Sequence, residues 1–198
     1  AVVSARDSGQ VDRIFVSTDD AGVRGLSLGA GVTVISRSSE ASSDSATAEM
    51  VVDEFLASPE GPGLNDDDFL VYLQPTSPFR SARHVGEALA LLADGRSQSV
   101  VSVREMTQLP RYAMEIQEDG LLAPTDFWHR GTGNRQTSTK LHCPNGAIYA
   151  FSIGAYRETG GFPFIGSLAY VMNAVSSIDI DAHEDLEIAR GLSGFMSL

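Results

Sequence analysis

The sequence has one cysteine, no long apolar run and no signal-peptide pattern. Because Cys143 is the only cysteine among 198 residues, an intrachain disulfide is impossible, and a reducing compartment, the cytoplasm, is the expected location. No apolar run approaches the roughly 20 residues that a membrane-spanning helix needs. The opening residues, AVVSARDSGQ, lack the charged and then apolar order of a signal peptide. We therefore expect no membrane partner.

Basic residues are scarce as well. The chain has 14 Lys and Arg against 26 Asp and Glu, which gives a net charge of −12. Domains that bind nucleic acid usually carry a basic footprint, so we expect no nucleic-acid partner. A nucleotide substrate remains compatible, because it needs only a few local cations or backbone N–H groups. Cys143, His84, His129 and His183 show no zinc-ligand spacing, and no nucleophile-elbow pattern occurs.

The sequence does contain alternating strand-like and helix-like segments. Its apolar content of 42% and charged content of 20% are typical of a globular domain. Runs rich in β-forming residues predict strands at residues 11–18, 32–35, 69–73, 99–103, 145–151 and 168–175. Apolar residues at helical spacing predict helices at residues 45–57, 81–93 and 185–192. This order predicts one α/β domain over residues 1–198, with a mostly parallel, doubly wound, Rossmann-like sheet.

Three segments add detail to this fold. Residues 69–73, FLVYL, are apolar throughout, which suits a central parallel strand covered on both faces. Residues 111–122 contain EDG between two extended runs and predict a β-hairpin. Residues 125–142 are polar with little periodicity, which predicts a loop or an arm that packs on another element.

Ligands of such folds bind at the carboxyl ends of the strands, so the segments that follow the strands are the candidates for function. LQPTSPFR, residues 73–80, follows the most apolar strand, and the amide of Gln74 suits the reading of a sugar or amide group. In RSSEASSDSAT, residues 37–47, Arg37 suits a phosphate, and Ser43 or Asp44 would cap the next helix. An ordinary strand-to-helix turn explains residues 73–80 equally well, and a Ser-rich loop before a capped helix is the preferred interpretation of residues 37–47.

Two aspartates alternate with isoleucines in SSIDID, residues 176–181. On a strand, alternate side chains share a face, so Asp179 and Asp181 would lie together. Like charges repel unless a cation lies between them, and oxygen ligands suit magnesium. The segment therefore predicts either a Mg²⁺ site or a solvated edge-strand face.

Taken in order, VSTDD, RSSEASSDSAT, LQPTSPFR, NRQ, PNGAIYAF and SSIDID resemble the motifs of the acylneuraminate cytidylyltransferases, or CMP-sialic acid synthetases. The resemblance runs from about residue 2 to about residue 192. It implies a nucleotide-diphospho-sugar transferase type of fold and transfer of CMP from CTP to a nonulosonate such as N-acetylneuraminate, with release of pyrophosphate and help from Mg²⁺. It also implies a homodimer formed through an excursion at about residues 105–143.

The resemblance also implies residue roles. Asp179 and Asp181 would hold Mg²⁺ against the triphosphate, and Asp181 and Arg135 would be catalytic. Arg135 matches the arginine of the family's RRQ-like motif near the reacting groups. The residues that would lie along the nucleotide or the sugar are Arg37, Ser43, Asp44, Ala46, Gln74 and Asn145.

Three features differ from the family pattern. The amino-terminal strand and Arg-, Ser-, Lys- and Gly-rich loop that cradles the triphosphate are not in this sequence, so we expect a truncated chain with little or no activity alone. Cys143 stands where many bacterial relatives carry an arginine, and Lys140 and His142 are the candidates to replace it. Ala46 and Ala48 stand where some relatives have serines.

Two functions remain open. The first is an enzyme that activates N-acetylneuraminate or a close relative such as legionaminate, pseudaminate or deaminated neuraminate; enzymes for eight-carbon keto-deoxy sugars fit the motifs less well. The second is a non-catalytic nucleotide- or sugar-binding relic of the family. The enzyme is favoured by the retained Gln74, Arg135, Asp179 and Asp181, whereas Cys143 and the missing loop favour the relic.

Overall fold

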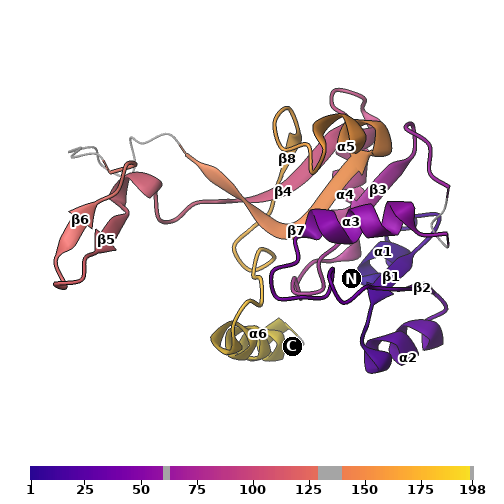
Figure 1. Ribbon diagram of the computed structural model, residues 1–198, viewed down its shortest axis with the longest axis horizontal. Coiled ribbons are helices and arrows are strands. Elements are labelled where there is room, and N and C mark those ends of the chain that lie inside the picture. The colour runs from indigo at the N-terminus through magenta and orange to yellow at the C-terminus, as the bar shows by residue number, and fades with distance from the viewer. Residues whose placement is uncertain (60–62, 129–139, 197–198) are drawn as a thin grey trace.

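The computed structural model describes residues 1–59, 63–128 and 140–196. Its centre is a four-stranded sheet in the order β3-β7-β4-β8 (Figure 1). The strands are β3 (Phe69–Tyr72), β4 (Ser99–Glu105), β7 (His142–Ser152) and β8 (Leu168–Val171). No helix among the described residues is long and apolar enough to cross a membrane.

Strand β7 runs against its neighbours. It pairs antiparallel with both β3 and β4, whereas β4 and β8 are parallel. The prediction of a mostly parallel α/β sheet is confirmed, with β7 as the exception. The reason is local: β7 begins beside the end of β4, with Glu105 opposite His142. The end of β4 and the start of β7 therefore lie side by side, which gives the two strands opposite directions.

Two further strands form a separate parallel pair in the described part of the chain. They are β1 (Phe15–Thr18) and β2 (Thr33–Ser36), joined by α2 (Ala21–Gly29). Asp20 caps α2 by accepting a hydrogen bond from the Val23 amide at 2.7 Å. The Phe15 ring meets Phe55 of α3 (Ala48–Ala57) edge-on at 5.2 Å, which ties this pair to the helix beside the larger sheet.

Helices cover both faces of the larger sheet, as a doubly wound fold requires. On one face, α4 (Ala82–Ala93) packs Val85 and Ala88 against β4 and β7, and α1 (Val2–Asp7) lies on α4. On the other, α3 and α5 (Ile153–Thr159) enclose Phe151 and Tyr156. Ala150 and Phe151 are consecutive on β7 and belong to the two different clusters, because neighbouring side chains point to opposite faces.

An arm leaves the sheet between β4 and β7. After the short helix η1 (Pro110–Tyr112), β5 (Met114–Ile116) and β6 (Leu122–Pro124) pair antiparallel. The hairpin prediction for this region is confirmed, and Gly120 in its turn has a φ of 81°. Figure 1 shows the hairpin projecting far from the sheet and its helices.

Two local predictions are wrong. Residues 178–181 are irregular rather than a strand, because the Ile180 amide bonds the Thr76 carbonyl at 3.0 Å instead of a ladder partner. Strand β3 is an edge strand of the four-stranded sheet, and Phe69 is 51% exposed, so it is not central. The closing helix, α6 (His183–Met196), is longer than predicted.

Candidate active site

A cavity lies where β2 and β3 end. Its volume is about 210 Å³. Four of the residues implied by the resemblance line it together: Arg37, Ser43, Ala46 and Gln74. They come from two segments that are distant in sequence, residues 37–47 and residues 73–80, so the fold brings the predicted nucleotide segment and the predicted sugar-reading amide to one place.

Arg37 supplies fixed positive charge at this cavity. Its Nε donates to Ser17 Oγ at 3.2 Å, and its Nη2 donates to the Ser17 carbonyl. These bonds tie a half-buried guanidinium to β1 at the end of β2. The positive charge of Arg37 also affects Tyr72. Burial raises the pKa of the Tyr72 hydroxyl, and the nearby Arg37 partly offsets that rise.

The amino terminus of α3 opens onto the same cavity. Thr47 caps the helix by accepting a hydrogen bond from the Met50 amide at 3.3 Å, so the prediction that Ser43 or Asp44 provides the cap is wrong. Ser43 Oγ donates instead to the Glu40 carbonyl at 2.8 Å, and Asp44 is exposed. Thr47 and Ala48 line the cavity, which places the first unpaired amides of α3 within reach of an anion.

The second part of the site is a bulge in β7. Between Val101 and Val103 the pairing partner jumps from Tyr149 to Pro144, so residues 145–148 stand opposite Ser102 alone. Ser102 fills the bulge, because its Oγ donates to Asn145 Oδ1 at 2.6 Å and accepts from the Ile148 amide at 2.7 Å. Bulges of this kind often re-aim side chains beside active sites.

Gly146, within the bulge, lies under two side-chain oxygens. A Cβ at this position would be 2.5 Å from Gln74 Oε1 and 2.8 Å from Asp179 Oδ2, and the φ of 76° also favours glycine. The two oxygens therefore converge on one point above the backbone. Two acceptors that share one point suit a hydroxyl donor or a cation.

The acidic residues differ in their surroundings. Asp179 is half-buried, and its Oδ1 has no hydrogen-bond partner among the described residues, whereas Asp181 is exposed at the start of α6. The prediction that the two share one strand face is wrong, since residues 178–181 are not a strand. The described residues contain no cluster of three or more His, Cys, Asp or Glu at metal-binding distance. The oxygen donors near Gly146 fit a hard divalent cation whose remaining ligands come from a substrate.

Asn145 faces the protein interior. Its Nδ2 donates to Ser177 Oγ at 2.9 Å, and its Oδ1 accepts from the Ala147 amide at 3.2 Å. The predicted contact with a sugar stays a prediction. In the structure, the buried Asn145 amide holds the turn that carries Gly146.

The remaining predicted residues lie on or near the arm. Arg135 falls outside the described residues. Lys140, a candidate replacement for the arginine lost at Cys143, forms an ion pair with Glu105 at 2.9 Å. Cys143 is half-buried on β7 and stands opposite Arg104 of β4.

Sequence reasoning assigned no role to Arg80, which lies at the centre of this site. It is only 4% exposed, and its Nη1 donates to the carbonyls of Gln74 and Ala147, both at 2.8 Å. Burial lowers the pKa of Arg80 to about 10, and the nearby charge of Asp179 works in the opposite direction. Its position at the end of LQPTSPFR was visible in the sequence, but its burial was not.

An aromatic cluster beside Asp179 was also missed. Its members are Tyr72, Tyr149, Phe162 and Phe164, with Tyr149 lying 4.9 Å from Phe162 and 5.9 Å from Phe164 between ring centroids. Burial raises the pKa of Tyr149, and the neighbouring Asp179 charge raises it further. No periodic signal marks the cluster, because three separate segments of the chain assemble it.

Solved structures share this fold. A 4-diphosphocytidyl-2C-methyl-D-erythritol synthase from Anaerococcus prevotii superimposes with a TM-score of 0.62 over 98% of this chain and 86% of that one, at 13% identity. A CMP:2-keto-3-deoxy-manno-octonic acid synthetase in complex with CTP gives 0.60 over 97% and 86%, at 14% identity. At such identities the likeness concerns the fold alone.

Curated relatives are closer in sequence. The N-acylneuraminate cytidylyltransferase of Streptococcus agalactiae serotype V is 32% identical over 92% of this chain, which spans only 43% of that protein. A CMP-N,N'-diacetyllegionaminic acid synthase of Legionella pneumophila is 27% identical over 96% of this chain and 82% of its own length. The family model described as cytidylyltransferase matches residues 1–117. Because that match covers more than half of the chain, this protein belongs to the cytidylyltransferase family.

Proposed function

We propose that this protein transfers CMP from CTP to the anomeric hydroxyl of a nonulosonate, N-acetylneuraminate or a close relative, with release of pyrophosphate. The observation that carries the proposal is the convergence of Gln74, Gly146 and Asp179 beside the cavity at the ends of β2 and β3. The relatives named for N-acylneuraminate and diacetyllegionaminic acid support this substrate class and leave the acyl group open.

CTP would occupy the cavity. Arg37 and the amino terminus of α3 offer a cation and unpaired amides to phosphate or base. Ala46 and Ala48 have no side-chain oxygen, so their contribution would come from the backbone. Ser43 and Asp44 on the same loop would lie along the nucleotide.

The sugar would lie near Gly146. Gln74 would read a sugar hydroxyl or amide, and Asn145 would act here as well, through the turn that it holds. The aromatic cluster of Tyr72, Tyr149, Phe162 and Phe164 lies beside this point and would offer apolar surface to an acyl group.

Mg²⁺ is the proposed cofactor. Asp179 and Asp181 would hold it, and the ion would neutralise charge on the phosphates as pyrophosphate leaves. The unpartnered Asp179 Oδ1 and the oxygens converging on Gly146 support this assignment. Arg135 is proposed to stabilise the same developing charge.

The arm is the proposed homodimer contact. Its hairpin exposes apolar side chains, among them Ile116 (77% exposed), Leu121 (64%) and Leu122 (65%). A projecting apolar hairpin is costly in water unless another surface covers it, and a second copy of the chain would do so. We expect neither nucleic acid nor membrane as a partner, and a cytoplasmic location stays a prediction.

A binding-only member of the family is the second candidate. The observation that favours it is the ion pair of Lys140 with Glu105, which engages the cation proposed to replace the arginine lost at Cys143. Such a protein would bind CTP or the sugar without forming pyrophosphate.

Pyrophosphate release tests the proposal. In a form of the protein that carries the family's amino-terminal strand and loop, CTP, Mg²⁺ and N-acetylneuraminate, or a legionaminate in parallel, should give pyrophosphate release, whereas this chain alone should give little or none. In that form, Asp179→Asn and Asp181→Asn should each slow release by at least about a hundredfold. Asp67→Asn, the same change at an exposed site in the loop before β3, is the matched control and should leave the rate unchanged. CTP binding without release would favour the second candidate, and neither binding nor release would contradict both.

A further inference from the structure

Arg80 is a buried cation that joins the two halves of the sugar site. Its Nη1 donates to the Gln74 carbonyl at the end of β3 and to the Ala147 carbonyl in the β7 bulge, both at 2.8 Å. These carbonyls belong to the residue that carries the sugar-reading amide and to the residue after Gly146. One guanidinium nitrogen thus fixes both backbones that set the point where Gln74 Oε1 and Asp179 Oδ2 converge.

The other guanidinium nitrogens face a charge that they do not contact. Arg80 Nε and Nη2 are buried without a hydrogen-bond partner among the described residues, and so is Asp179 Oδ1. No ion pair within 4 Å joins Arg80 to Asp179 among those residues, yet Asp179 is the charge that acts on the buried guanidinium. A buried charge without a close ion-pair partner costs stability, so stability alone does not account for an arginine here.

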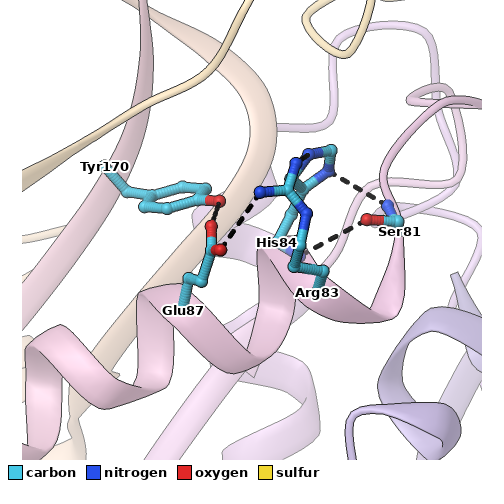
Figure 2. Close-up of polar contacts among 5 residues, drawn as sticks. All are labelled: Ser81, Arg83, His84, Glu87 and Tyr170. Atoms are coloured by element: carbon cyan, nitrogen blue, oxygen red, sulfur yellow. Dashed lines mark hydrogen bonds and ion pairs between the residues drawn. The ribbon is translucent and has the colours of Figure 1, made fainter.

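The backbone of Arg80 is held firmly from both sides. Its carbonyl accepts a hydrogen bond from Ser4 Oγ of α1 at 2.8 Å. The next residue, Ser81, caps α4, and the Ser81 amide donates to His84 Nδ1 at 3.1 Å (Figure 2). Figure 2 also shows Glu87 of α4 bound to the Tyr170 hydroxyl of β8, so the start of α4 is anchored to the sheet. The guanidinium therefore reaches Gln74 and Ala147 from a fixed base.

We propose that Arg80 is the positioning residue of the sugar site, a role that rests on the function proposed above. Its hydrogen bonds hold the Gln74 and Ala147 carbonyls, and its charge draws the Asp179 carboxylate toward Gly146. Arg80 does not touch the substrate, because its nitrogens are buried. It acts through Gln74 and Asp179.

Arg80→Lys and Arg80→Met in the full chain test this role. Lysine keeps the positive charge but has a shorter side chain, whereas methionine keeps only the apolar bulk. Arg80→Lys therefore remains informative if Arg80→Met folds poorly. Arg83→Lys and Arg83→Met are the matched controls, since Arg83 lies three residues later on the exposed face of α4 and pairs with Glu87 at 3.1 Å.

Two readouts separate positioning from a purely structural role. In pyrophosphate release, Arg80→Lys should raise the KM for the sugar at least about fivefold. It should leave the KM for CTP within about twofold, because the residues that line the nucleotide cavity, apart from Tyr72 and Gln74, belong to residues 37–51. Arg80→Met should show the larger effect. A structural role alone would reduce kcat with the folded fraction and leave both KM values unchanged.

Amide hydrogen exchange gives the second readout and needs no activity. In both Arg80 variants, exchange should speed up in residues 74–77 and 145–148 by at least about tenfold more than in the Arg83 variants, with the rest of the sheet unchanged. Unchanged exchange in these two segments, or equal changes in the KM for sugar and CTP, overturns the proposal. If the wild-type protein that carries the family's amino-terminal strand and loop releases no pyrophosphate, the proposed function fails, and exchange alone decides whether Arg80 positions this site.

Discussion

Gly146 is the residue at which the geometry of the site is most sensitive. Gly146→Ala should destabilise the protein in two ways: a side chain at a φ of 76° costs about 1–2 kcal/mol, and the clash with Gln74 Oε1 and Asp179 Oδ2 adds about 1–3 kcal/mol. Denaturant unfolding measures the total. Pyrophosphate release should fall at least about tenfold, because both side chains must move.

Gly95→Ala is the control for Gly146→Ala. Gly95 has nearly the same φ, 75°, but a Cβ there would meet no atom within 4 Å. Its cost should be the conformational one alone, with activity unchanged. If the two variants lose equal stability and activity, the crowding of oxygens over Gly146 is not what matters.

His84 predicts a dependence of stability on pH. Burial, with help from the nearby Arg83 and Arg80, lowers the pKa of His84 below its ordinary value, while Glu87 opposes this. Well above about pH 6.5 the imidazole is neutral in the folded and in the unfolded protein, so it does not change the free energy of unfolding. As the pH falls below that value, the unfolded state binds the proton more readily, so the free energy of unfolding decreases.

His84→Gln tests this prediction. Glutamine is the usual partner of a serine in a capping box, so Ser81 keeps its acceptor and the titrating group is lost. Melting temperatures measured from about pH 7.5 to about pH 5.5 should fall less in the variant than in the wild type. His183→Gln, on the exposed first turn of α6, should keep the wild-type profile. An identical slope for all three proteins would rule out His84 as the cause.

At the scale of elements, α3 depends on its cap. Thr47→Ala removes the acceptor for the Met50 amide and should lower the free energy of unfolding by about 1 kcal/mol. Thr47→Ala should also raise the KM for CTP, because Thr47 and Ala48 line the nucleotide cavity. Asp44→Ala, in the loop before the same helix, should change the free energy of unfolding by less than about 0.5 kcal/mol. Equal losses in chemical denaturation would assign the cap to the loop instead.

At the scale of the whole molecule, the arm is the proposed homodimer contact. Ile116 and Leu122 stand opposite each other across the hairpin and are 77% and 65% exposed. The double variant Ile116→Asp and Leu122→Asp should convert a dimer into a monomer. The free-energy cost of burying two carboxylates at an interface exceeds the free energy gained from the contact. Light scattering coupled to gel filtration measures the mass.

Leu26→Asp is the matched control for the arm. Leu26 on α2 is 79% exposed, so the variant adds the same charge at an equally open apolar site away from the hairpin. It should remain a dimer. A wild-type mass equal to the single 21.1 kDa chain would contradict the dimer proposal.

Local sequence patterns were enough to predict the kinds of elements and the order of the motifs. Local patterns such as the apolar runs of β3 and β4 and the EDG turn of the arm depend on adjacent residues, so they could be predicted. The α/β class could be predicted for the same reason. The ordered motifs predicted the family, which the match over residues 1–117 confirms.

The tertiary structure decided how these parts meet. The reversed direction of β7, its bulge at residues 145–148 and the convergence of Gln74 with Asp179 all depend on contacts between segments far apart in the chain. The burial of Arg80 also depends on such contacts. Its hydrogen bonds to the Gln74 and Ala147 carbonyls can form only when the ends of β3 and β7 lie side by side. Sequence spacing governs neighbours along a helix or strand, but burial and register set which distant side chains share a site.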